Sequence, residues 1–180
     1  MSVSDRSDPL GRRFSLGDLH HVGVVVPDIE QAAADVERIY GMSVAVFDET
    51  RFTCRIRGVE QTSVQRIGLT AGPPPHLELL REVPGSEIWT PAPGIHHLGF
   101  VVDDLASAAS EWEQAGAPVW MAGVQRGTCP AGATYHRDPL GQVFELLDRA
   151  LADSMARRID HSGPTTESAS TERNVHGRKA

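Results

Sequence analysis

The chain has 180 residues, of which 40% are hydrophobic and 23% are charged. This composition suits one soluble domain or two small modules with an ordinary apolar core. Asp and Glu outnumber Lys and Arg by 24 to 17, which gives a formal net charge of -7. We therefore expect neither nucleic acid nor an anionic membrane surface as a partner, because proteins bind both through positive charge.

No stretch approaches the roughly 18 consecutive apolar residues of a membrane span, and the first residues lack the apolar segment of a signal peptide. A cytoplasmic protein is therefore expected. Cys54 and Cys129 lie far apart and form no CxxC motif, which argues against a disulfide framework and against a thiolate zinc site. Any metal ion would be held by histidine and carboxylate side chains.

The first half of the chain reads as strand, helix and three strands. Residues 1–15 are predicted to be a flexible N-terminus, and residues 16–90 a first βαβββ module. A strand is predicted at Leu19–Val26. A helix capped by Asp28 and ended by Gly41 follows it. The remaining strands of this half are expected at Ser43–Phe47, Thr62–Leu69 and His76–Leu80.

The second half repeats this order after a Pro-rich linker at residues 91–94. Residues 95–148 are predicted to form the second βαβββ module, with a helix capped by Asp104 and ended by Gly116. Its later strands are expected at Pro118–Met121, Ala133–Arg137 and Val143–Leu147. Residues 149–160 can form a short helix, and residues 161–180 have too few apolar residues to offset the entropy of ordering, so a disordered tail is predicted.

The two halves also repeat particular residues. Leu19–Asp28 aligns without a gap with Ile95–Asp104, at an offset of 76 positions, and His-His-x-Gly recurs at the same place. Each closing strand carries one glutamate, Glu78 or Glu145. A module of about 65 residues has only a marginal core, so we expect the two sheets to pack side by side as one unit.

The repeat brings together residues that could bind a metal ion. Alternate side chains of a strand share a face, so only one histidine of each pair can enter a common cavity. The resulting set is His21, Glu78, His97 and Glu145. Two imidazoles and two carboxylates suit one divalent ion such as Mn, Fe, Co, Ni or Zn. Such an ion would assist removal of a proton beside a carbonyl by a carboxylate base. The expected partner is a small molecule with a carbonyl or vicinal oxygens.

Three segments resemble the vicinal oxygen chelate superfamily, which includes glyoxalase I, methylmalonyl-CoA epimerase, extradiol dioxygenases, and fosfomycin and bleomycin resistance proteins. They are His21-Val-Gly-Val-Val-Val-Pro-Asp, His97-Leu-Gly-Phe-Val-Val-Asp-Asp and Tyr135-His-Arg-Asp-Pro-Leu-Gly-Gln-Val-Phe-Glu-Leu-Leu. The resemblance implies an α+β fold, in which two βαβββ modules form one curved, cup-shaped mixed sheet with the helices outside. It also implies one divalent ion (Co, Ni, Zn, Mn or Fe) held by His21, Glu78, His97 and Glu145.

A fourth ligand at Glu78 is similar to the pattern of glyoxalase I and methylmalonyl-CoA epimerase. The resemblance therefore implies a metal-dependent epimerase, isomerase or lyase that acts through a metal-bound enolate, with Glu145 as one catalytic base. Glu60 is the nearest match to the second base of such epimerases. Gln65 could hydrogen-bond the substrate, and the Tyr135 hydroxyl could reach a metal-bound oxygen.

Two other functions stay open from the sequence. An extradiol-type Fe(II) dioxygenase would use only His21, His97 and Glu145, and a metal-free binding protein would sequester a drug or natural product in the same cup. Neither a basic cluster for a CoA phosphate nor a glutathione-binding signature is evident, so the substrate is not identified. The sequence also leaves a homodimer open, and with it the question whether the site lies inside one chain or is shared between two.

Overall fold

The structure is a computed structural model that describes residues 14–162. The predicted flexible N-terminus and disordered tail therefore lie almost entirely outside the described residues. The elements in chain order are a short 3-10 helix at Leu16–Asp18, then β1 (Leu19–Val26), α1 (Ile29–Tyr40), β2 (Val44–Val46), β3 (Thr50–Ile56), β4 (Val59–Gln65), β5 (Ile67–Thr70), β6 (His76–Arg81), β7 (His97–Val102), α2 (Leu105–Gln114), β8 (Val119–Val124), β9 (Ala133–Arg137), β10 (Val143–Asp148) and α3 (Arg149–Ser162).

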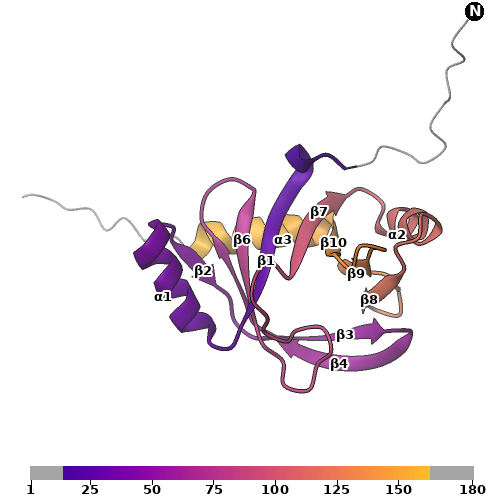
Figure 1. Cartoon of the computed structure of the whole chain (residues 1–180), viewed down its shortest axis with the longest axis horizontal. Coiled ribbons are helices and arrows are strands. Elements are labelled where there is room, and N and C mark those ends of the chain that lie inside the picture. Colours follow the sequence, from indigo (N-terminus) through magenta and orange to yellow (C-terminus); the bar gives the residue numbers. More distant parts are fainter. Residues whose placement is uncertain (1–13, 163–180) are drawn as a thin grey trace, which may run out of the picture.

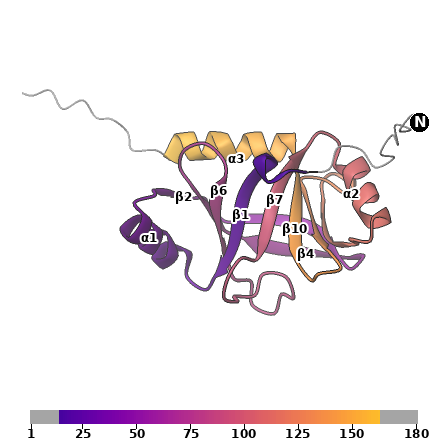
Figure 2. The ribbon, with the colours of Figure 1, turned by 45° about the horizontal axis from the view of Figure 1, so that its top comes forward.

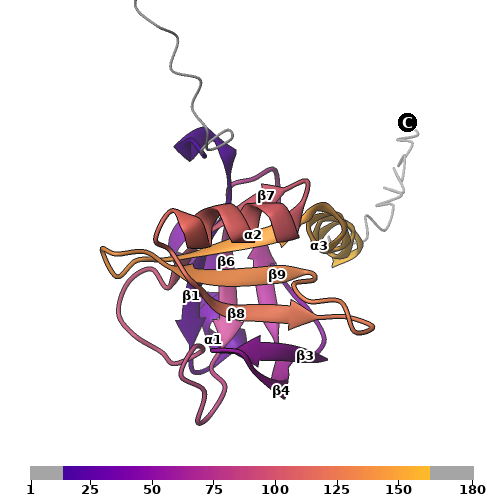
Figure 3. The same cartoon turned by 90° about the vertical axis from the view of Figure 1, so that its right-hand side faces the viewer.

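All ten strands form one curled sheet in the order β2-β5-β6-β1-β7-β10-β9-β8-β3-β4. Figure 3 shows one end of this order, where β9, β8, β3 and β4 follow one another. The two opening strands, β1 and β7, lie next to each other at the middle and run antiparallel. Each is flanked by the closing strand of its own half, because β6 is parallel to β1 and β10 is parallel to β7. The predicted α+β cup built from two repeated halves is confirmed, and the repeat places its four key strands side by side.

The helices begin where the sequence indicates. The Asp28 side chain accepts a hydrogen bond from the Gln31 backbone N–H, and Asp104 accepts one from Ser107, so both predicted N-caps are present. Helix α1 packs beside β2, β5 and β6, and α2 beside β9 and β10. Figure 2 shows α1 and α2 at opposite ends of the molecule, with α3 between them. Helix α3 contacts β10, β7 and β2 and therefore joins the two halves.

One hairpin is longer than the sequence predicted. The expected strands Ser43–Phe47 and Thr62–Leu69 are parts of two long arms, β2 with β3 and β4 with β5, which turn at Arg57-Gly58. The inner parts of the arms pair with each other beside β6, whereas the outer part, β3, pairs with β8 of the other half. The sequence predicted no strand in residues 48–61, which is wrong, because β3 and the start of β4 lie there. As a result, this one hairpin supplies both edge strands of the sheet, β2 and β4 (Figure 1).

Helix α3 is held by apolar contacts with both halves, since Leu147 of β10 belongs to the same cluster as residues of the first half. Met155 and Ile159 are buried in one cluster with Phe47 and Leu69, and Leu151 packs against it. Leu151, Met155 and Ile159 recur at helical spacing and form one apolar stripe of the predicted helix. None of the helices in residues 14–162 is long and apolar enough to cross a membrane.

Candidate metal centre

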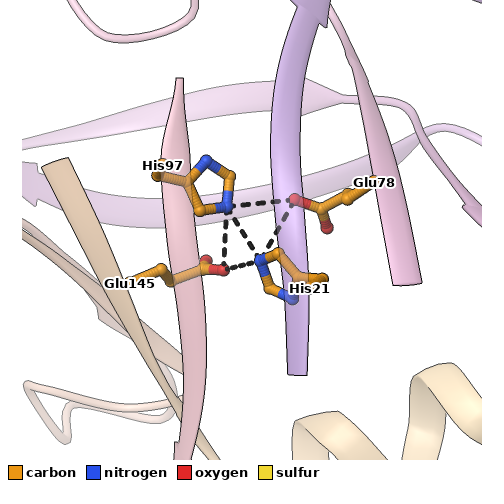
Figure 4. A group of neighbouring side chains, drawn as sticks. All are labelled: His21, Glu78, His97 and Glu145. Carbon is orange, nitrogen blue, oxygen red and sulfur yellow. Dashed lines mark hydrogen bonds and ion pairs between the residues drawn. The ribbon is translucent and has the colours of Figure 1, made fainter. Parts of the chain in front are cut away.

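Four buried side chains meet inside the cup, each from a different strand of the central group. They are His21 on β1, Glu78 on β6, His97 on β7 and Glu145 on β10 (Figure 4). Their relative exposures are 0%, 2%, 1% and 6%. One ligand atom from each lies within 4.8 Å of all the others. The structure thus brings together the four residues that the sequence selected.

The distances between these atoms suit a cation at their centre. The Nε2 atoms of His21 and His97 face each other at 2.8 Å. Oε2 of Glu145 lies 2.9 Å from His21 Nε2, and Oε2 of Glu78 lies 3.2 Å from His97 Nε2. Within residues 14–162 neither of these buried oxygens has a hydrogen bond of acceptable geometry. Buried carboxylates without such partners are costly, and a divalent ion bound by all four groups would satisfy them.

The glycine of each His-x-Gly motif makes room for the histidine of the other half. His21 is the register partner of Gly99, and Gly23 is the partner of His97. A Cβ atom at Gly23 would lie 2.0 Å from Cε1 of His97, and one at Gly99 would lie 2.2 Å from Cε1 of His21. Neither overlap is possible for a real side chain. The repeated motif therefore has a reciprocal steric role, because each half supplies one ligand and the space for its counterpart.

The pKa values of His97 and Glu145 are shifted by the other buried groups of the site. Burial lowers the pKa of His97, but its interactions with Glu145 and Glu78 outweigh this effect and raise that pKa to about 9. Burial raises the pKa of Glu145, but interactions with His21 and His97 lower it to about 2. Both shifts have one cause: two buried carboxylates attract positive charge. A proton on His97 supplies it in the metal-free chain, and a divalent ion would replace that proton.

A cavity of about 220 Å³ opens beside the four residues, and Glu78 and Glu145 form part of its wall. Gln65 and Tyr135, the two predicted substrate-binding residues, also line it. The Gln65 Oε1 atom accepts a hydrogen bond from the Arg66 backbone N–H, and its buried Nε2 has no partner among the described residues. Gln65 therefore offers a donor to a ligand in the cavity.

Tyr135 lies against the ligand set. Its ring centroid is 5.0 Å from that of His97. Burial, followed by the negative charges of Glu145 and Glu78, raises the pKa of Tyr135 well above its usual value. The hydroxyl therefore stays protonated at neutral pH and can act as a hydrogen-bond donor.

Glu60 lies apart from the other candidates. It is on the outer part of the long hairpin, on β4, with its carboxylate half exposed and paired with Arg55 at 3.3 Å. Glu60 is not among the residues that line the cavity. The structure therefore unites all the predicted site residues except this second base.

Sequence reasoning missed one wall of the cavity. The lining includes Leu151, Ser154, Met155 and Arg158 of α3, together with residues of the long hairpin such as Phe52 and Ile67. The apolar stripe of residues 149–160 signalled a helix that packs on the protein. It did not show which surface the helix would cover, since periodicity reports only that one face is buried.

Residues 20–135 match the family described as the Glyoxalase/Bleomycin resistance protein/Dioxygenase superfamily. The chain belongs to this superfamily. The ethylmalonyl-CoA/methylmalonyl-CoA epimerase of Cereibacter sphaeroides is 35% identical to it over 115 residues, which are 60% of this chain and 78% of the relative. The resemblance inferred from the three segments is thus confirmed at the level of the superfamily.

Solved structures agree on the fold. The methylmalonyl-CoA epimerase of Streptomyces coelicolor, in complex with 2-nitronate-propionyl-CoA, superposes with a TM-score of 0.52 at 18% identity, covering 74% of this chain and 97% of the other. The methylmalonyl-CoA epimerase of Mycobacterium tuberculosis has a TM-score of 0.49 at 22% identity, covering 73% and 87%. The Cereibacter sphaeroides relative places the chain among enzymes of the glyoxalase superfamily.

Proposed function

We propose that this protein is a divalent-metal-dependent epimerase that moves a proton on the carbon beside a thioester carbonyl of a small acyl-CoA. The observation that carries the proposal is Glu145, which contacts the histidines of the candidate metal centre and also faces the cavity. The name of the Cereibacter sphaeroides relative supports the reaction and the substrate class.

His21, Glu78, His97 and Glu145 would hold the ion, which is Co, Ni, Zn, Mn or Fe. When bound, it supplies a Lewis acid for a carbonyl beside it. The remaining chemistry belongs to the chain. A free Oε atom of the Glu145 carboxylate takes the proton from the carbon next to the carbonyl. The Gln65 amide and the Tyr135 hydroxyl donate hydrogen bonds to the oxygens of the substrate and orient it.

Epimerisation also requires that a proton return to the opposite face of the carbon. The family pattern suggested Glu60 for this step, but in the structure its carboxylate pairs with Arg55 outside the cavity. The proposal therefore assigns Glu145 alone as a base. The buried apolar walls near the reacting carbon, among them Leu80, Trp89 and Met121, exclude bulk water. The proton for the opposite face therefore comes from a donor held inside the cavity, and both this donor and Glu145 exchange their protons with solvent between turnovers.

The cavity is small for a drug-binding protein. Its volume of about 220 Å³ lies below the range of roughly 300–1,000 Å³ that is usual for sites that enclose drug-sized ligands. A short acyl group suits this volume, with the rest of a CoA thioester outside. The site also contains four buried polar groups with a clear use in metal binding, which a purely apolar binding cup does not need.

Glu78 distinguishes the proposal from an extradiol-type dioxygenase. It is as deeply buried as the histidines and lies 3.2 Å from His97 Nε2, so it takes part in the set rather than flanking it. We expect Glu78→Ala to lose both the ion and activity. If this variant kept its ion and consumed O₂ with catechols, the dioxygenase function would replace the proposal.

The test begins with the metal content of the purified chain, measured by elemental analysis before and after incubation with each candidate ion. About one ion per chain, lost in His97→Ala, is expected. The loaded protein is then incubated with methylmalonyl-CoA and ethylmalonyl-CoA in D₂O, and uptake of deuterium beside the carbonyl is followed by mass spectrometry. Glu145→Gln should abolish exchange and keep the fold. Absence of exchange in the metal-loaded wild type with both thioesters would refute the proposal.

All four candidate ligands come from one chain. Their four strands are adjacent in one sheet, and the β3–β4 part of the hairpin pairs with β8 of the same chain. The homodimer stays a prediction, and we propose that activity does not depend on the exchange of modules between subunits. Equal specific activity above and below the concentration at which a dimer dissociates would support this.

A further inference from the structure

Each of the two candidate metal-binding histidines is backed by the histidine that precedes it. Nδ1 of His97 lies 2.9 Å from Nδ1 of His96, and Nδ1 of His21 lies 2.9 Å from Nδ1 of His20. We infer that His96 is a positioning residue that fixes the tautomer and the orientation of His97, so that the lone pair of His97 Nε2 points at the ion. The inference rests on the proposed metal site and adds a role for a residue that does not itself touch the ion.

The direction of the hydrogen bonds follows from one carbonyl group. Nε2 of His96 lies 2.9 Å from the backbone oxygen of Ile88. A carbonyl oxygen only accepts hydrogen bonds, so Nε2 of His96 must carry the proton. In the neutral ring, Nδ1 of His96 is then an acceptor, and the only group that can donate across the 2.9 Å contact is Nδ1–H of His97.

This arrangement leaves Nε2 of His97 without a proton, as a metal ligand requires. The opposite direction would place the proton of His97 on Nε2, where it would occupy the position of the ion. Histidine ligands of metal ions usually donate their second N–H to a carboxylate, a carbonyl or water. Here a neutral imidazole takes that place and passes the hydrogen bond on to a carbonyl.

The Ile88 carbonyl, which ends this relay of hydrogen bonds from His97 through His96, is itself held in place. Ile88 is buried, and the hydroxyl of Ser86 accepts hydrogen bonds from the backbone N–H groups of Ile88 and Trp89. The backbone N–H of His96 donates to the Gly23 carbonyl on β1 at 2.8 Å. The relay from Ile88 through His96 to His97 is therefore fixed at both of its ends.

The first half has a less direct version of this relay. His20 contacts the ring of His76 with centroids 5.3 Å apart, and Nδ1 of His76 donates to the Thr70 carbonyl at 2.9 Å. The carbonyl is thus one residue further from the ligand than in the second half. We expect replacement of His20 to affect the ion less than replacement of His96, which makes His20 the matched comparison.

Neither of these histidines occupies a regular strand position. The register of β1 against β7 shifts between Leu19 and His21, and His96 precedes the first residue of β7. Strict alternation, which would turn each ring away from its neighbour, therefore fails at both places. Each pair of consecutive histidines therefore has one ring in the site and the other ring behind it.

The test compares His96→Leu with His96→Asn. Leu removes the acceptor, whereas the amide oxygen of Asn can lie near the former Nδ1. We expect His96→Leu to bind Zn²⁺ and Co²⁺ about 10–100-fold more weakly than the wild type, with most of the affinity restored in His96→Asn. His20→Leu should lose less. Affinity is measured by competition with a chromophoric chelator, and the fold is checked by circular dichroism.

A second measurement needs no variant and reports the tautomer itself. In the wild type labelled with ¹⁵N-histidine and loaded with ¹¹³Cd²⁺, we expect the metal to couple to Nε2 of His97 and a proton to reside on its Nδ1. A proton-free Nδ1 on His97, or coupling of the metal through that atom, would overturn the inference, as would unchanged Zn²⁺ affinity in a folded His96→Leu. Failure of the wild type to bind any ion would instead refute the proposed function.

Discussion

A methyl group at Gly23 tests the reciprocal packing of the two halves. In Gly23→Ala, the new Cβ would lie 2.0 Å from Cε1 of His97, whereas ordinary contact begins near 3.4 Å, so the ring must retreat by about 1.4 Å. The backbone at Gly23 does not have a positive φ, so the effect is steric and not conformational. Overpacking of this kind costs about 1–3 kcal/mol of stability.

The effect on the ion should be larger than the effect on the fold. Ligand distances in a metal site tolerate shifts of only about 0.2 Å, so the displaced His97 ceases to be a ligand. We expect Gly23→Ala to bind Zn²⁺ at least about 100-fold more weakly, because loss of an outer partner alone costs about 10–100-fold. Gly99→Ala should have a similar effect through His21, whose Cε1 would lie 2.2 Å from the new Cβ.

The assay is a Zn²⁺ competition titration together with urea unfolding of the metal-free chain. Gly17→Ala is the matched control, because its Cβ would meet only the Ser15 Oγ atom at 3.4 Å, and it should leave both affinity and stability unchanged. A folded Gly23→Ala that bound Zn²⁺ within about threefold of the wild type would differ by less than about 0.7 kcal/mol. This result would refute the argument that Gly23 makes room for His97.

Three other changes probe the surroundings of the site. Met155→Ala should lower the free energy of unfolding by about 2–5 kcal/mol, measured in urea, because Met155 is 5% exposed between α3 and the first half. A thiol reagent should label Cys129 first and Cys54 only in denaturant, since Cys54 is fully buried and burial raises the pKa of its thiol. Glu60→Gln should change stability by less than about 1 kcal/mol and leave Zn²⁺ affinity unchanged, and a loss of epimerisation, with the ion and the exchange catalysed by Glu145 retained, would identify Glu60 as the second base.

Much of the site could be predicted because the chain carries its own internal comparison. A lone histidine in a strand has little meaning, but His21 and His97 occupy matching places in two repeated segments, as do Glu78 and Glu145. Matching places in two pseudo-symmetric halves are related by one axis, and those on the strands next to this axis lie close together. The adjacent, antiparallel arrangement of β1 and β7 is that axis region, and it is where the four side chains meet.

The long hairpin could not be predicted by the same comparison. Its outer part, β3 with β4, has no counterpart in the second half, and its strand pairing with β8 is a contact between segments far apart in the sequence. Local patterns specify that a segment is extended but not which distant edge it joins. The position of α3 was unpredictable for the same reason, and both elements shape the cavity wall.

The long hairpin and α3 also explain how the two halves can differ although their candidate ligand residues match. The ligand strands must keep their residues, because each half provides both a histidine and the glycine that accommodates the other histidine. A change in one half would therefore disturb the ligand of the other. The hairpin and α3 lie outside this reciprocal constraint and contact the cavity through Phe52, Ile67 and Met155. Variation in these walls can alter which ligand fits, while the four candidate metal-binding residues stay intact, and this separation of tasks is expected when function is grafted on a shared fold.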